Sequence, residues 1–160
     1  MINFRSPKSA FTLIELLVVV ALLGLFAAIS LGFIAKGKQK GNDTRRLSDL
    51  NQVQKALELY HTNNGKYPTT LDDLKTEGFL SEVPKDPKGA AYKYAALGPS
   101  CNDYHLGAIL EEVGSKYLAT DADLLVSSVV CTGSASDFVG ASLDCTATAG
   151  TDQCYDVTLK

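Results

Sequence analysis

The stretch Lys8-Ser9-Ala10-Phe11-Thr12-Leu13-Ile14-Glu15-Leu16-Leu17 opens an apolar segment that runs to Ala35 with Glu15 as its only charge. As a helix, the segment from Phe11 to Ala35 would be roughly 37 Å long, enough to cross a hydrocarbon core with some tilt. An ionised carboxylate near the edge of such a segment costs up to a few kcal/mol. The acid therefore needs a partner, and this need points to a subunit that assembles through the segment.

Length and charge limit what the rest of the chain can be. The chain has 160 residues, and the part after the apolar segment is long enough for one domain with its own core. The net charge is −3, but residues 36–100 carry 11 Lys and Arg against 8 Asp and Glu, whereas residues 101–160 carry 2 against 9. The basic residues never cluster with aromatic residues, so we expect no nucleic-acid partner.

The cysteines all lie in the last 60 residues, and they are Cys101, Cys131, Cys145 and Cys154. An even number in a part expected to lie outside the membrane predicts two disulfides. Four cysteines allow three pairings, and the short loop between Cys145 and Cys154 favours that pair, with Cys101 and Cys131 left for the other. A zinc site is less favoured, because the chain has no Cys-x-x-Cys pair with a nearby His.

The amino terminus allows three interpretations. An ordinary secretory signal would be cut near Ala28-Ile29-Ser30, but the apolar segment is too long for one and Glu15 interrupts it. A plain membrane anchor would leave Glu15 at the interface. In either case the chain would act as a stand-alone binding domain, secreted or tethered. The flanking charges would keep the domain in the cytoplasm, whereas the cysteines favour export, which large domains can achieve regardless of charge.

The third interpretation is a resemblance. Residues Lys8 to Leu17 resemble the type III signal of type IV pilins and pseudopilins. The resemblance implies that residues 1–10 are a leader, that prepilin peptidase cuts between Ala10 and Phe11, and that the new Phe11 amine is methylated. The family usually has Gly where Ala10 stands. Glu15 would then lie one helical turn from a cationic amine, its own or that of an incoming copy, and would drive assembly by pairing with it.

Beyond the apolar segment, the pattern predicts an α+β domain over residues 36–160. A buried stripe at spacings of three and four predicts a helix from about Thr44 to His61, continuous with the apolar segment. Thr69 or Thr70 is expected to cap a short second helix. Strands are expected at residues 91–95, 104–110, 124–131 and 155–159. A long helix packed on a small antiparallel sheet is the pilin fold.

The middle of the chain sharpens the resemblance. The motifs that carry it are Lys55-Ala56-Leu57-Glu58-Leu59-Tyr60, Asn64-Gly65-Lys66-Tyr67-Pro68-Thr69 and Val83-Pro84-Lys85-Asp86-Pro87-Lys88-Gly89. They are similar to the major pseudopilin of type II secretion systems, whereas residues 100–154 are more similar to a surface-exposed pilin. Pilus and secretion pseudopilus therefore stay open as alternatives.

The resemblance also implies partners and a location. The chain would be a non-enzymatic filament subunit that polymerises with copies of itself through residues 11–35. It would wait in the cytoplasmic membrane as a single-pass protein with its globular domain outside, and an assembly platform with its ATPase would move it into an extracytoplasmic filament.

The acidic half of the chain holds one candidate metal site. Asp121 and Asp123 alternate in a loop and can supply hard oxygen ligands for calcium, and they resemble part of the calcium loop of major pseudopilins. The glycine-rich body of that loop is not reproduced here, and a solvated turn is the alternative. Asp137, Asp144, Asp152 and Asp156 lie nearby in the sequence. His61 and His105 are expected to be structural, and we find no catalytic constellation.

Overall fold

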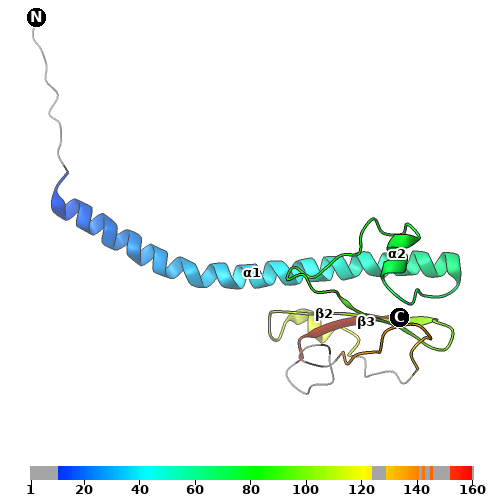
Figure 1. Cartoon of the computed structure of the whole chain (residues 1–160). Coiled ribbons are helices and arrows are strands. Elements are labelled where there is room, and N and C mark those ends of the chain that lie inside the picture. The colour runs from blue at the N-terminus through cyan, green and yellow to red at the C-terminus, as the bar shows by residue number, and fades with distance from the viewer. Residues whose placement is uncertain (1–10, 124–128, 141, 143–144, 146–151, 160) are drawn as a thin grey trace, which may run out of the picture. The chain divides into compact units, whose positions relative to one another are not determined.

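The computed structural model describes residues 11–123, 129–140, 142, 145 and 152–159, with the backbone alone at residues 29–33 and 35. The leader over residues 1–10, with Ala10 of the expected cleavage site, lies outside the described residues, as does most of the strand expected at 124–131. The elements are α1 (Leu13–Asn64), α2 (Asp72–Thr76), β1 (Lys93–Leu97), β2 (Asp103–Ile109), a 3₁₀ helix (Lys116–Ala119) and β3 (Cys154–Thr158) (Figure 1).

The chain divides into two compact units after Lys38, and α1 contributes to both. In the first unit, the apolar side chains that the structure describes are exposed, from Phe11 at 81% to Phe26 at 64%. Among the described residues, no helix has an apolar stretch long enough to cross a membrane. The membrane span expected over residues 11–35 stays a prediction.

The second half of α1 carries the stripe that builds the core. Its members are buried as the spacing predicts: Leu47, Leu50, Val53, Leu57 and Tyr60. The helix is continuous through Gly37 and Gly41, so these glycines do not break it. It ends at Asn64, slightly beyond the expected end near His61, and Gly65 follows with a φ of 70° and an N–H that donates to the His61 carbonyl at 2.8 Å. A left-handed glycine that closes the last turn is a common helix terminus.

The sheet has the order β1-β2-β3 with both pairs antiparallel, which confirms the α+β architecture expected from the resemblance. Three of the expected strands are present with shifted ends. At the expected strand 124–131, the described part forms only an isolated bridge between Val130 and Leu97.

The central strand β2 is buried on both faces. On one face, Tyr104, Leu106 and Ala108 join the core built by the stripe of α1. On the other face lie His105 and Gly107, which Phe138 covers, and Phe138 forms a second cluster with Cys145 and Cys154. A sheet covered on both faces turns alternate side chains into two separate environments. The first is apolar, and the second holds the polar groups described below.

The four cysteines form two disulfides, Cys101–Cys131 and Cys145–Cys154, with Cα–Cα distances of 5.1 and 5.0 Å. This is the pairing that the short loop favoured. By the chain-entropy estimate, the bonds stabilise the fold by about 3–4 and about 2–3 kcal/mol respectively, because the first closes the longer loop. Both bonds hold the carboxyl-terminal segment against the sheet.

The cap of α2 differs from the expectation. The residue at the N-cap position is Leu71, and neither Thr69 nor Thr70 caps the helix with its hydroxyl. Instead, the carboxylate of Asp73 accepts the backbone N–H of Thr70 at 3.0 Å. An acid in the first turn can satisfy an upstream donor and also favours the positive end of the helix dipole. The Asp73 carboxylate therefore holds the chain just before the helix, and no side chain caps the helix itself.

A buried arginine ties α1 to the far side of the domain. The Arg46 side chain is 2% exposed, and its guanidinium pairs with three carboxylates, those of Asp43, Asp86 and Glu111. Asp43 in turn accepts the backbone N–H groups of Glu111 and Glu112, both at 2.9 Å. Burial alone would raise the pKa of Asp86, but the hydrogen bonds from Arg46 and the Lys88 N–H, together with the positive charges of both residues, outweigh it and hold that pKa below its usual value.

We expect Arg46→Met to lower the free energy of unfolding by about 3–5 kcal/mol, because it leaves buried carboxylates without their cation. The neighbouring Arg45 side chain is 66% exposed and, within the part of the chain that the structure describes, makes a single long ion pair, with Asp49 at 3.9 Å. Arg45→Met is therefore the matched control and should cost about 0–1 kcal/mol. Denaturant unfolding of the detergent-solubilised chain measures both, and equal losses would contradict the central role of Arg46.

Candidate functional site

The expected assembly residue, Glu15, lies in the first turn of α1. Its Oε2 atom accepts hydrogen bonds from the Thr12 hydroxyl at 3.2 Å and from the Thr12 backbone N–H at 3.4 Å. The Glu15 N–H donates back to the Thr12 hydroxyl at 3.3 Å. This reciprocal arrangement is a capping box, which satisfies free N–H groups at a helix start. Sequence analysis missed the role of Thr12, although Thr followed three residues later by Glu is its signature.

The surroundings of Glu15 are apolar and unburied within this chain. Leu13, Ile14, Leu16 and Leu17 are all exposed, as is Phe11 at the expected new amino terminus. Exposed contiguous apolar surface marks a site of contact with protein or lipid. The first unit therefore presents one carboxylate, at the start of a helix, within an exposed apolar surface.

The acidic candidates Asp121 and Asp123 come together with a third acid. One carboxylate oxygen from each of Asp121, Asp123 and Asp156 lies within 4.8 Å of the others. Asp121 and Asp123 follow the 3₁₀ helix, whereas Asp156 is in the middle of β3. From sequence, Asp156 is only one of several acids near the loop. The available signal was an acid inside a predicted strand, since a charge between apolar strand neighbours requires a partner.

Backbone hydrogen bonds hold the loop against β3. The Ala122 N–H donates to the Asp156 carbonyl at 3.1 Å, and the Asp123 N–H donates to the Asp156 carboxylate at 3.0 Å. Asp123 has a φ of 47°, a left-handed conformation that Asp adopts more readily than most residues. The loop thus places two of its acids beside an acid from the strand.

Asp121 lacks what a buried carboxylate needs. Both of its carboxylate oxygens are buried, and neither has a hydrogen-bond partner among the described residues. Burial, together with the negative charges of Asp123, Asp156 and Asp152, raises the pKa of Asp121 to about 7. Burial likewise raises the pKa of Asp152. The cluster therefore needs a proton or a cation.

These residues fit calcium. Calcium prefers carboxylate and carbonyl oxygens and takes six to eight of them in flexible geometry. Three carboxylates converge here, and the buried oxygens of Asp121 have no other partner. A divalent cation would neutralise the mutual repulsion that raises the pKa of Asp121.

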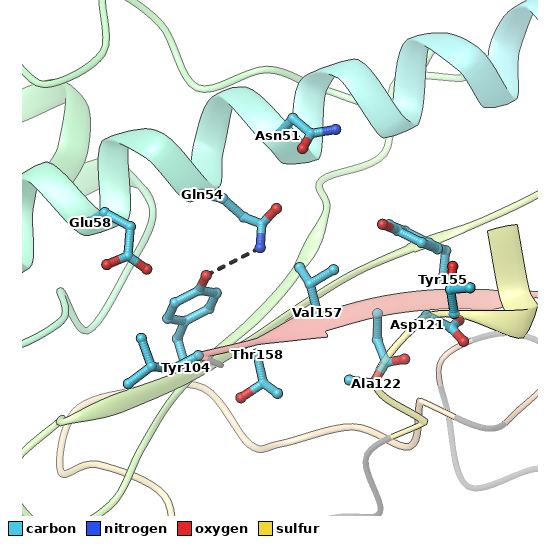
Figure 2. Close-up of a pocket in the computed structure, with 12 residues that line it drawn as sticks. Asn51, Gln54, Glu58, Tyr104, Asp121, Ala122, Tyr155, Val157 and Thr158 are labelled. Carbon is cyan, nitrogen blue, oxygen red and sulfur yellow. Dashed lines mark hydrogen bonds between the residues drawn. The ribbon is translucent and has the colours of Figure 1, made fainter.

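A cavity of about 550 Å³ adjoins the cluster, between α1 and β3 (Figure 2). Asp121 lies on the side of β3, and the polar side chains of Asn51, Gln54 and Glu58 from α1 line the opposite side. Asp156 is also among the residues that line the cavity. Within the cavity, the Gln54 amide donates to the Tyr104 hydroxyl at 3.3 Å. Asp123 is itself exposed, so an ion can reach the cluster from solvent.

Both histidines have structural contacts. His61 stacks on the Tyr67 ring at a centroid distance of 4.5 Å. His105 is fully buried in β2 and its two ring nitrogens contact Asp137 and Asp156.

Two protein families match the sequence. The prokaryotic N-terminal methylation motif matches residues 5–31, and type II secretion system protein G matches residues 34–115. The chain is similar to the type II secretion system core protein G of Pseudomonas aeruginosa, with 32% identity over 138 residues, 75% of this chain and 95% of that protein. It is also similar to the core protein G of Vibrio cholerae, with 31% identity over 134 residues, 73% of this chain and 90% of that protein.

We expect the calcium-free chain to lose stability as the pH rises from about 4 to about 7. The pKa of Asp121 is about 7 in the fold against an ordinary 3.8, so the folded state holds the proton more tightly than the unfolded state between these values. Stability is then greatest below the unfolded pKa and falls until the folded pKa is passed.

Melting temperatures in EGTA at pH 5 and pH 8 measure this effect. Asp121→Asn removes the titrating group and should reduce the loss between the two pH values, whereas Glu82→Gln, at an exposed acid, should leave it unchanged. A fall of the same size in wild type and Asp121→Asn would show that Asp121 does not titrate in this way.

Proposed function

The chain belongs to the type II secretion system protein G family, and on this basis we propose that it is a structural subunit of a type II secretion pseudopilus. The observation that carries the proposal is the order of the two family matches: a methylation motif over residues 5–31 is followed directly by protein G over residues 34–115. The match to protein G favours the pseudopilus over a pilus, and the methylation motif disfavours a stand-alone binding domain with an ordinary signal.

The first step would be processing of the amino terminus. Prepilin peptidase would cut between Ala10 and Phe11, and the new Phe11 amine would be methylated. The support is the match to the methylation motif, together with a small residue at position 10. Processing would leave the apolar segment on the mature protein, as assembly through that segment requires.

The second step would be docking of a subunit through its amino-terminal helix. The free Phe11 amine would be largely cationic at neutral pH. Glu15 is the only charge of the apolar segment, and the capping box with Thr12 holds its carboxylate at the start of the helix. Pairing with the amine of a neighbouring copy would remove an unpaired charge from an apolar environment, and would fix the axial register of the two helices.

The location and machinery follow from the same proposal. The subunit would sit in the cytoplasmic membrane as a single-pass protein through residues 11–35, with the globular domain outside. An assembly platform and its ATPase would then move it into the filament. The two disulfides support an oxidising compartment for the globular domain.

The proposal includes a calcium ion at Asp121, Asp123 and Asp156. Bound there, calcium would supply positive charge that joins the loop at 121–123 to β3, and it would so stabilise the globular domain. The support is the convergence of three carboxylates and the buried, unpartnered oxygens of Asp121. The role is structural, and we propose no reaction at this site.

We expect the mature protein to begin at methylated Phe11. Mass spectrometry of the amino-terminal peptide, from membranes and from sheared filaments, measures the start residue and its methyl group. A start at Leu31 would instead indicate ordinary secretion, and an intact Met1 would indicate a plain anchor. An Ala10→Gly variant, which restores the usual residue of the family, should be cut at the same bond.

We expect Glu15→Ala to leave membrane insertion intact and to abolish filaments, because the neighbouring amine loses its carboxylate. Glu15→Gln separates charge from capping, since Gln can still complete a capping box but carries no charge. It should also abolish filaments. Shearing and electron microscopy measure the outcome, with Glu82→Ala as a control at an exposed acid.

Normal filaments from Glu15→Ala would contradict the pairing mechanism. Filaments from Glu15→Gln but not from Glu15→Ala would show that the cap, and not the charge, is what assembly requires.

A further inference from the structure

A buried histidine lies directly behind the acidic cluster. His105 is 0% exposed, and its Nε2 atom is 2.7 Å from Oδ2 of Asp156. Its Nδ1 atom is 2.7 Å from Oδ1 of Asp137. Asp137 and Asp156 are also fully buried. Both ring nitrogens are therefore occupied by carboxylates that water does not reach.

The same contacts fix the orientation of Asp156. Its Oδ2 atom faces His105, and its Oδ1 atom accepts the backbone N–H of Asp123 at 3.0 Å. The carboxylate is thus held from β2 on one side and from the loop on the other. A carboxylate held at both oxygens is preorganised and cannot rotate away when a cation arrives.

The imidazole itself is held by packing. The Phe138 ring stacks on His105 with a centroid distance of 3.7 Å and an interplanar angle of 16°. Phe138 lies over Gly107, where a Cβ atom would be only 2.7 Å from Cε2 of the ring. Gly107 pairs directly with Asp156 across β2 and β3. The missing side chain at position 107 makes room for the ring that fixes the plane of the histidine.

We propose that His105, backed by Asp137, is a positioning residue of the cation site: it orients Asp156 so that the three carboxylates are preorganised for calcium. Groups that hydrogen-bond to metal ligands typically contribute tenfold to a hundredfold in affinity. The inference rests on the calcium proposal above. It also makes segment 132–138, which follows Cys131 and carries Asp137 and Phe138, part of the support of the site.

The test is a calorimetric titration with calcium. Metal is first removed from the full chain in detergent with EGTA, and calcium is then titrated in. Wild type and Asp121→Asn test the calcium site itself. His105→Phe tests the inference, because it keeps a ring to stack on Phe138 but removes both donors. His61→Phe is the matched control, since His61 stacks on Tyr67 and contacts no member of the cluster.

We expect wild type and His61→Phe to bind calcium alike, Asp121→Asn to bind it weakly, and His105→Phe to bind it about tenfold to a hundredfold more weakly. His105→Gln keeps a donor for one carboxylate and should recover part of the affinity. The melting temperature in EGTA separates the roles, because a merely structural residue would lower it and leave calcium affinity unchanged.

Unchanged calcium affinity in His105→Phe, with wild-type binding intact, would overturn this inference and leave the calcium proposal standing. A wild-type chain that takes up no calcium would overturn both. Should His105→Phe fail to fold, His105→Gln decides the question: binding several-fold weaker than wild type supports the positioning role, and equal binding refutes it.

Discussion

A carboxylate that is withdrawn from water must find a positive charge, a proton or a set of hydrogen-bond donors, and this constraint organises the protein. It acts at three places. Glu15 is the only charge of an apolar segment, the three carboxylates around Arg46 join α1 to the rest of the domain, and the cluster of Asp121, Asp123 and Asp156 gathers at β3.

The three places differ in how many partners the carboxylates find within the chain. Arg46 balances its acids within the fold, so that cluster is closed and structural. The acids at β3 are balanced only in part, because His105 serves Asp156 while the oxygens of Asp121 have no hydrogen-bond partner among the described residues. Among the described residues, Glu15 accepts hydrogen bonds only from Thr12. A carboxylate that is fully paired within the fold is thus structural. One that lacks partners within the fold is suited to an external partner, whether a cation or the amine of another copy.

Much of the fold could be predicted from local sequence. The stripe of α1, its glycine terminus and the short-loop disulfide depend on spacings within a few residues, and each is present in the structure. The expected threonine cap of α2 was wrong, because Leu71 stands at the N-cap position without a side-chain cap and the Asp73 carboxylate instead accepts the Thr70 N–H. In the candidate site, Asp121 and Asp123 were visible because they alternate in one loop. Asp156 and His105 were not, because 51 residues separate the two partners of their hydrogen bond.

The sequence by itself determined the apolar amino-terminal segment with its single acid, the amphipathic half of α1 and the family to which the chain belongs. These features depend on residue types and on their spacing over a few residues, and both can be read directly from the sequence. Only the tertiary structure decided which acids meet and which cation or histidine serves them. The pairing of β2 with β3 brings His105 and Asp156 onto one face, and the return of segment 132–138 brings Asp137 and Phe138 to that face. Such contacts arise from the register of the strands and from segments that fold back onto the sheet, so no local sequence pattern predicts them.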